Sequence, residues 1–183
     1  PPAEAPKGVG QLLGPYVKLS QAFRAARAYA AGAYVVDVVV RPALIAREAR
    51  AYAQSVGKPV LNVGAGTPGS SFRVAVLGPT LWGDVNIDIA APRGVPHGAG
   101  RVSYGDGMDL SEWPDKHFGA VVASHVLEHV SNPWRAWAEW SRVADRVYAI
   151  TPPWWAPHTW MHPGPRWYVS PSGKCLPLHG SGT

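Results

Sequence analysis

The glycine-rich segment at residues 64–69 has the composition of a ligand-binding turn. It reads Gly-Ala-Gly-Thr-Pro-Gly and follows a short apolar run at residues 60–63. Glycines after a strand allow a tight turn and bring backbone N–H groups against a ligand, and a helix that follows favours an anion. Asp88 stands 24 residues after Gly64, at the end of a second apolar run. A carboxylate there can accept hydrogen bonds from both hydroxyls of a ribose, so the pair predicts a cofactor that contains adenosine.

Two cofactor classes satisfy this pattern, a nicotinamide dinucleotide and S-adenosylmethionine. A glycine turn can also be purely structural, so the sequence downstream has to decide. Against a dehydrogenase, the chain has no Tyr-x-x-x-Lys pair, and little of it is left for a substrate domain. A nucleotide-hydrolysing loop would carry Lys where this chain has Ser70.

Three histidines are candidate catalytic residues: His125, His158 and His162. His125 begins the sequence His-x-x-Glu-His, which formally matches a zinc-peptidase pattern, but it comes directly after a strand-like run and no third ligand is evident. We therefore predict no metal site. The other two histidines lie among several tryptophans near the C-terminus. That segment either forms the wall of an acceptor pocket and supplies a base, or only covers an edge of the sheet.

Four segments in the expected order resemble class I S-adenosylmethionine-dependent methyltransferases, in particular the small-molecule methyltransferase-like group. Residues 60–66 (Val-Leu-Asn-Val-Gly-Ala-Gly) are similar to motif I, and residues 85–89 (Val-Asn-Ile-Asp-Ile) to motif II. Residues 105–110 resemble the loop that surrounds the adenine, and residues 118–130 resemble the signature of the fourth strand. Glu139 and Arg142 match the helix that follows. The resemblance covers residues 59–152.

The resemblance implies a set of cofactor-binding residues. Gly64 and Gly66 would hold the methionine portion, Asp88 the ribose, and Met108 and Asp109 the adenine. The full set is Asn62, Gly64, Ala65, Gly66, Asp88, Ile89, Met108, Asp109, Ser124 and His125. Asn62 and Gly119 stand where the family usually carries acidic residues, and Ala144-Asp145 replaces a Pro-Gly-Gly turn.

The reaction that the resemblance implies is methyl transfer from S-adenosylmethionine to an unidentified acceptor. The alternative is a methyltransferase-like binding or structural protein without turnover, because a fold can persist without its activity.

The elements that would position these residues predict an α/β fold. Short apolar runs separated by helical or irregular segments indicate a Rossmann-like, mostly parallel sheet. The strands are expected at residues 60–63, 85–89, 101–104, 119–124 and 146–150, with helices at 71–78 and 132–143. The C-terminal end is shortened and rich in Pro and Trp, with a hairpin expected from residues 166–169 and 174–178.

Two helices are expected before this core. The first spans residues 19–40 with Ser20 as its N-cap, and the second begins at Pro42 and stops at Gly57. We expect residues 1–58 to form an arm and helices that pack on the core, and residues 59–183 to form the core itself.

Composition and charge indicate a globular, cytoplasmic protein with a possible anionic partner. Hydrophobic residues make up 46% and charged residues 16% of the chain, and Cys175 is its only cysteine. The most apolar stretch, residues 30–46, contains Asp37, Arg41 and Pro42, so no membrane span is expected, and no secretory signal pattern is present. The whole net charge of +5 lies before residue 61. It predicts either an anionic partner or a solvated helix face.

Overall fold

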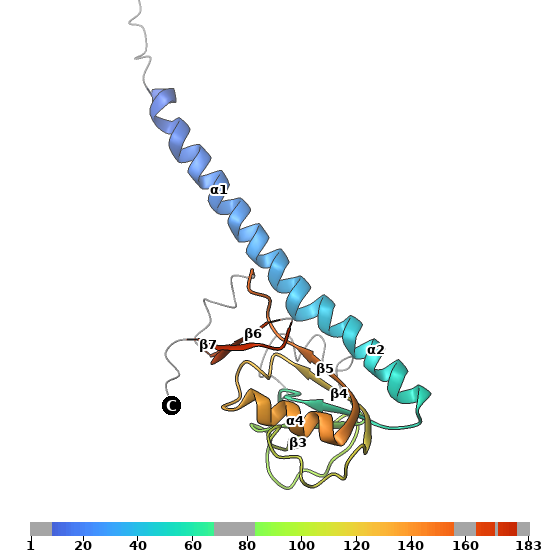
Figure 1. Ribbon diagram of the computed structural model, residues 1–183. Helices are drawn as coiled ribbons and strands as arrows, with labels where there is room; N and C mark the ends of the chain where they lie inside the picture. Colours follow the sequence, from blue (N-terminus) through green and yellow to red (C-terminus); the bar gives the residue numbers. More distant parts are fainter. Residues whose placement is uncertain (1–8, 68–82, 156–163, 171, 179–183) are drawn as a thin grey trace, which may run out of the picture.

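The computed structural model describes residues 9–67, 83–155, 164–170 and 172–178 (Figure 1). The helix expected at residues 71–78 and the candidate bases His158 and His162 lie outside the described residues.

The core is a five-stranded, all-parallel sheet, as expected from the sequence. Its strands are β1 (Val60–Val63), β2 (Val85–Asp88), β3 (Ser103–Tyr104), β4 (Phe118–Ser124) and β5 (Ala144–Ile150). Their order in the sheet is β3-β2-β1-β4-β5. From β1 the chain adds β2 and β3 on one side of the sheet and then returns to add β4 and β5 on the other, so the strand order reverses between β1 and β4. Ligands bind such sheets at the carboxyl ends of the strands on either side of this point. The fold is therefore the predicted Rossmann-like one.

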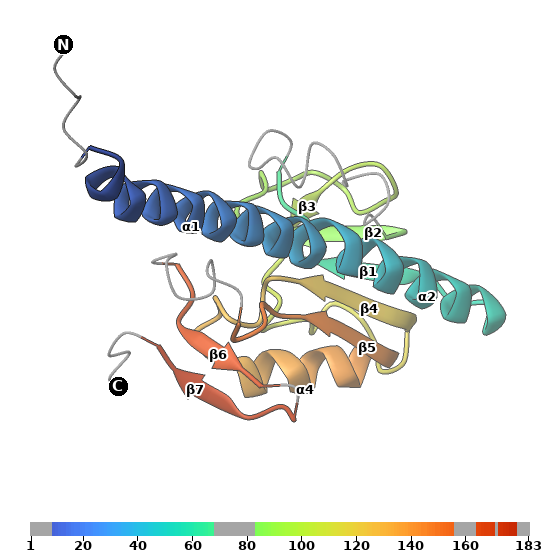
Figure 2. The ribbon, with the colours of Figure 1, turned by 90° about the horizontal axis from the view of Figure 1, so that it is seen from above.

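Helices cover both faces of the sheet (Figure 2). Side chains alternate between the two faces along each strand. Val60 and Val122 pack with α2 (Arg41–Ser55), through its buried Ala49 and Ala53. The neighbouring strand residues, such as Leu61 and Val121, point to the other face. There α4 (Pro133–Val143) contributes Ala136, Trp140 and Val143 to the larger core cluster. The expected start of α4 is confirmed, because the Asn132 side chain accepts a hydrogen bond from the Arg135 N–H as an N-cap.

The N-terminal helices form one continuous helical rod. Helix α1 (Val9–Val35) runs into a π-helical turn, η1 (Val36–Val40), and this turn runs directly into α2. The predicted start of the first helix near residue 19 is therefore wrong. The second helix begins at Arg41, one residue before the predicted start at Pro42, but no loop separates it from the first. Proline is accommodated in the first turn of α2, where its missing N–H costs little. Figure 1 shows α1 extending well beyond the sheet, while α2 lies across it.

This rod changes the expectation about membrane spans. Among the described residues, the run Ala22–Ser55 is long and apolar enough to cross a membrane by length and composition alone, with a mean hydropathy of 1.4 over 18 residues. Only 22% of that window is buried, although α2 buries Ala49 and Ala53 against the sheet. The length and composition of a single helix are weak evidence for a membrane span.

The expected C-terminal hairpin is present. Strands β6 (Trp167–Val169) and β7 (Cys175–Pro177) pair antiparallel as a separate two-stranded sheet. Backbone N–H groups of Arg166 and Trp167 both donate to the Glu128 carbonyl, which fixes the hairpin to the segment that follows β4.

Candidate functional site

A cavity of about 450 Å³ opens at the carboxyl ends of β1, β2 and β4, at the point where a parallel sheet binds ligands. Glycines, apolar side chains and a few polar groups line it. The lining residues are Val63, Gly64, Gly66, Asp88, Ile89, Gly105, Asp106, Gly107, Met108, His125, Val126, His129, Val130, Ser131 and Arg166.

The glycine loop after β1 is held open by backbone conformation. Gly64 and Gly66 have φ angles of +67° and +72°, in the left-handed region that side chains disfavour. A Cβ on Gly64 would lie 2.2 Å from the Cγ2 of Val126, which comes from the loop after β4. Glycine is therefore required here both for the turn and for the close approach of the two loops that form the cavity.

Asp88 ends β2 and faces the same cavity. Its Oδ2 accepts a hydrogen bond from the Gly66 N–H at 2.8 Å, and its Oδ1 accepts one from the Ala90 N–H at 2.8 Å. Each carboxylate oxygen can accept a second hydrogen bond. The side chain thus shapes the glycine loop and still has acceptor capacity for a ligand.

The loop after β3 closes the far side of the cavity. Asp106 and Asp109 form an isolated antiparallel bridge, and the Asp106 carboxylate accepts a hydrogen bond from the Met108 N–H at 2.9 Å. A Cβ on Gly107 would lie 2.7 Å from the Cγ1 of Val63, so the loop presses directly onto β1. Met108 lines the cavity and is partly buried, which suits contact with an apolar ring.

Helix α4 anchors this loop from behind. The Glu139 carboxylate accepts a hydrogen bond from the Leu110 N–H at 2.9 Å. Arg142 donates to both Glu139 and the Leu110 carbonyl. Hydrogen bonds from the Arg142 side chain, with a smaller contribution from the Leu110 N–H, lower the pKa of Glu139. The two residues that match the family pattern on α4 therefore support the loop and lie outside the cavity.

His125 occupies the carboxyl end of β4 in a strained conformation. Its φ is +57°, uncommon for a residue with a side chain, and such strain is concentrated at functional sites. The imidazole lies between two buried carboxylates. Its Nδ1 is 3.2 Å from Glu128 Oε1, and its Nε2 is 3.7 Å from Asp37 Oδ2. Among the described residues, Nε2 makes no hydrogen bond.

Asp37 reaches this position because it lies in η1, the π-helical turn between α1 and α2. Its side chain is fully buried and forms an ion pair with Arg41, one turn later. Single π-helical turns within α-helices are frequent at functional sites. The N-terminal rod therefore contributes a charged residue beside the cavity. A charged residue inside an apolar helical run was the only sign of this in the sequence.

Six of the ten residues expected to bind cofactor line the cavity: Gly64, Gly66, Asp88, Ile89, Met108 and His125. Four do not. Asn62 is buried on the α2 face of β1 and donates to the Asn86 carboxamide at 3.3 Å. Ala65 is buried, and Ser124 is buried at the end of β4. Asp109 accepts a hydrogen bond from the Ser111 N–H. Hydrogen bonds from the Ser111 side chain and backbone lower the pKa of Asp109.

Several lining residues were not predicted from the sequence. Asp106 and Gly107 lie in the segment that resembles the adenine loop, but the resemblance assigns them no role. His129 enters the sequence pattern only as a zinc ligand. Arg166 is distant in sequence and reaches the cavity through the hydrogen bonds of its backbone to Glu128. Among the described residues, no group of three or more His, Cys, Asp or Glu side chains is arranged to hold a metal ion.

Comparison with known proteins identifies the family of this domain. Residues 61–146 match the family model described as "Methyltransferase domain". This range contains the glycine loop, Asp88, the Met108 loop and His125. No curated protein matches the chain. Residues 61–146 are a methyltransferase domain. Together with the parallel sheet and its flanking helices, the match identifies the class I fold and favours methyl transfer over the dehydrogenase, nucleotide-hydrolase and zinc-peptidase alternatives.

Packing explains one departure of this methyltransferase domain from its family pattern. Gly119, where an acidic residue is usual, lies against α2. A Cβ there would be 2.8 Å from the Cα of Ala53 and 3.1 Å from the Cγ2 of Val56. The close approach of the N-terminal rod to β4 leaves no room for a side chain. Another departure, Asp145 near the start of β5, forms an ion pair with Lys58 at 2.8 Å and connects β5 to the end of the rod.

Proposed function

We propose that the methyltransferase domain uses S-adenosylmethionine as its methyl donor. One observation carries this proposal: Asp88, the glycine loop, Met108 and His125 line one cavity. This cavity lies where the strand order reverses, between β1 and β4. The family match supports the same donor.

The cavity residues fit the parts of this cofactor. Asp88 retains acceptor capacity toward the cavity, as two ribose hydroxyls require. Gly64 and Gly66 bring the backbone close without side chains in the way. Met108 offers an apolar contact for the adenine, and the Gly107 backbone beside it allows a ring to approach. Asn62 does not contribute, so the cofactor's ammonium group would be held by backbone carbonyls of the glycine loop.

The cofactor, when bound, supplies a methyl group that is already activated by its sulfonium. The work left to the protein is to hold the acceptor in line with that methyl group and to exclude water, which together account for most of the rate enhancement in such reactions. His125 is the candidate to accept a proton from the acceptor. Its Nε2 is buried and lies toward Asp37, so Nδ1, 3.2 Å from Glu128 Oε1, is the nitrogen that would take this proton.

Calorimetry with S-adenosylmethionine, S-adenosylhomocysteine and NAD in parallel tests this proposal. S-adenosylhomocysteine at a hundred times its Kd should stabilise the fold by about 2.7 kcal/mol, a shift of a few degrees in Tm. NAD should give no shift. Equal shifts with NAD, or none with any of the three, would reject the cofactor. Binding without transfer to any acceptor would favour the alternative, a methyltransferase-like protein without turnover.

We also propose that the basic N-terminal third contacts an anionic partner. Arg24, Arg27 and Arg47 are exposed on the rod, and Figure 1 shows that α1 extends beyond the domain. Exposed basic residues spaced along the rod, with Arg24 and Arg27 on the projecting α1 and Arg47 on α2, create a positive field that attracts anions. A cytoplasmic location remains a proposal that rests on the single cysteine.

A further inference from the structure

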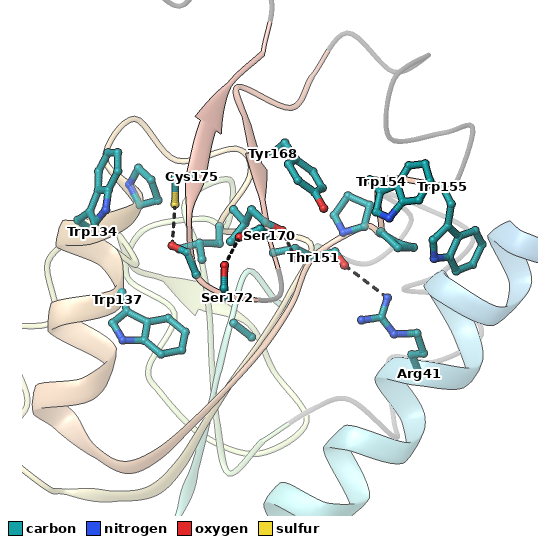
Figure 3. A pocket seen from close by; sticks show the side chains of 17 residues that line it. Arg41, Trp134, Trp137, Thr151, Trp154, Trp155, Tyr168, Ser170, Ser172 and Cys175 are labelled. Atoms are coloured by element: carbon teal, nitrogen blue, oxygen red, sulfur yellow. Dashed lines mark hydrogen bonds between the residues drawn. The ribbon is translucent and has the colours of Figure 1, made fainter.

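A second, larger cavity of about 610 Å³ lies at the carboxyl end of β5, and no part of the cofactor assignment uses it. Five segments enclose it: Leu127 after β4, the start of α4, the end of β5 with the residues after it, the β6–β7 hairpin and Arg41 at the start of α2. Figure 3 shows the hairpin residues Ser170 and Ser172 in the middle, Trp134 and Trp137 on one side, and Trp154 and Trp155 on the other.

Tryptophan dominates the walls of this cavity. Trp134, Trp137, Trp154 and Trp155 line it and are 42–63% exposed. Four exposed indoles around one hollow form an apolar surface of the kind that marks a binding site rather than a solvated face. The volume also falls in the range of pockets that hold one small molecule.

The charges of the lining residues restrict the ligand. Arg41 is the only charged side chain that lines the cavity among the described residues, and no carboxylate does. A cationic ligand would find no carboxylate to pair with and could be held only by the indole faces. Arg41 is paired with Asp37 through Nη1, and its remaining N–H groups can donate to an anionic ligand. Hydroxyl groups of Thr151, Ser170 and Ser172 can hydrogen-bond to a neutral or anionic group. The chemistry fits a planar apolar ligand that is neutral or negatively charged.

Two parts of the wall, Trp134 and Arg41, are held by contacts within the protein. The Trp167 indole N–H donates to the Val130 carbonyl at 3.0 Å, and its ring packs edge-on against Trp134 with centroids 5.3 Å apart. Arg41 donates to the Thr151 carbonyl at 3.4 Å while it pairs with Asp37 (Figure 3). A preformed site loses less entropy when it binds a ligand.

The two cavities are neighbours across one short segment. Val126 lines the cofactor cavity and Leu127, the next residue, lines the tryptophan cavity. Arg41 of the tryptophan cavity pairs with Asp37, which lies beside His125 of the cofactor cavity. Both cavities also open at the carboxyl ends of strands, where an acceptor would have to meet the cofactor.

We propose that the tryptophan cavity binds the apolar part of the methyl acceptor, a planar aromatic group that is neutral or anionic. This assignment rests on the proposed function, because only methyl transfer requires an acceptor next to the cofactor cavity.

Cys175 provides a direct readout, since it lines the tryptophan cavity and is the only cysteine of the chain. Burial raises the pKa of its thiol, so alkylation by iodoacetamide is best followed at about pH 8.5. The probes are 1-naphthoate, 1-naphthol and 1-naphthylmethylammonium, which share one ring system and differ in charge. We expect the first two to slow alkylation in proportion to their occupancy, and the cation to bind at least tenfold more weakly.

Matched variants separate the tryptophan cavity from the rest of the protein. Trp137→Ala and Trp154→Ala should each weaken naphthoate binding at least tenfold by calorimetry and leave S-adenosylhomocysteine binding unchanged. Phe23→Ala is the control, because Phe23 is 63% exposed on α1 and does not line the cavity. It should bind naphthoate as the wild type does.

The outcome also separates this proposal from the cofactor proposal. S-adenosylhomocysteine and naphthoate should bind together, and Asp88→Asn should weaken only the binding of S-adenosylhomocysteine, by at least tenfold. The proposal is overturned if naphthoate leaves Cys175 alkylation unchanged, if both tryptophan variants bind naphthoate normally, or if S-adenosylhomocysteine displaces it. Binding of naphthoate to a protein that does not bind S-adenosylhomocysteine would reject the proposed function, and with it the acceptor role of the cavity.

Discussion

The Gly66 N–H and the Asp88 carboxylate are joined by a hydrogen bond of 2.8 Å, which ties the glycine loop after β1 to the end of β2. The other carboxylate oxygen accepts from Ala90, so both oxygens already hold the backbone that surrounds the cavity. Asp88 is therefore a structural residue of the loop as well as a candidate ligand for ribose. A substitution at this position acts on both roles, and the choice of variant decides which one is measured.

Asp88→Asn should weaken S-adenosylhomocysteine binding by at least tenfold. The carboxamide has nearly the same shape, but it replaces one acceptor oxygen by an N–H₂ group and removes the charge. Hydrogen bonds to a charged group contribute roughly 1.5–3 kcal/mol each, so losing one of them from the ribose accounts for this factor. Both variants should also lower the free energy of unfolding. Gly66 and Ala90 both lose their acceptor in Asp88→Ala, and one of them meets the N–H₂ group instead of an acceptor in Asp88→Asn, so the loss should be larger for Asp88→Ala. Calorimetry and urea unfolding of both variants measure the two effects.

Asp84 is the control for this prediction, with a role that the sequence did not reveal. Its place before β2 alone predicts that Asp84→Ala has little effect. However, Asp84 Oδ2 accepts a hydrogen bond from the Val60 N–H at 2.8 Å, at the start of β1. Asp84→Ala should therefore lower the stability by about 1 kcal/mol and leave S-adenosylhomocysteine affinity as in the wild type. A larger loss of affinity in Asp84→Ala than in Asp88→Asn would mean that the cofactor cavity is misplaced.

Glu139 should make part of the stability depend on pH. Its pKa is lowered from an ordinary value of 4.5, chiefly by the hydrogen bonds from Arg142. A carboxyl group with a depressed pKa in the folded state stabilises the fold above the unfolded pKa and loses this contribution as pH falls through the folded pKa. Glu139→Gln should therefore lower the stability by roughly 1–2 kcal/mol at pH 7, and its effect should shrink as the pH falls below 4.5 and through the lowered pKa of Glu139.

Thermal unfolding between pH 7 and pH 3 tests the Glu139 prediction. Glu48→Gln is the matched control, since Glu48 is exposed on α2, and its effect should be small at every pH. An equal loss for Glu139→Gln at pH 7 and at pH 3 would show that the carboxylate charge is not what holds the Leu110 loop.

Charge reversal on the N-terminal rod tests the anionic partner. Replacing Arg24, Arg27, Arg47 and Arg50 by Glu should weaken salt-sensitive binding to nucleic acid or to anionic vesicles, because each basic residue lost reduces the attraction of the positive field. Reversal of the exposed Arg101, in the electrically neutral part of the chain, should have little effect. Titrations at low and high salt measure both. No binding by the wild type at low salt would leave these residues as a solvated helix face.

Local patterns in the sequence were sufficient to predict much of the fold. β1 was predicted with its observed bounds, because four apolar or buried residues stand between Pro59 and a glycine. α4 was predicted at residues 132–143, and the structure shows why it starts there: Asn132 caps the helix that begins at Pro133. The hairpin followed from a Pro-Ser-Gly turn between short apolar runs. Each of these signals lies within a few residues of the element that it specifies.

Long-range contacts produced the features that the sequence could not predict. The helical rod continues through Pro42 because α2 packs on the sheet, and tertiary packing outweighs a local break signal. Asp37 lies beside His125 only because η1 brings the rod to the end of β4. Asn62 points away from the cavity because alternate residues of β1 face opposite sides, and its partner Asn86 lies on the neighbouring strand. Pairing across strands is not visible in either segment alone.

Gly64→Ala should be among the most destabilising changes in the cofactor cavity, for two separable reasons. A non-glycine residue at a φ of +67° costs about 1–3 kcal/mol, and a Cβ there would lie 2.2 Å from the Cγ2 of Val126. Gly94→Ala isolates the first cost, because Gly94 has a φ of +83° and a Cβ at that position would meet nothing within 4 Å. Val126→Ala removes the clashing methyl, so the double variant should lose less stability than the two single losses together. A double-mutant cycle by urea unfolding measures this coupling. Strict additivity would mean that the loops after β1 and β4 do not touch as described, and the wall between the cofactor and tryptophan cavities would then be open.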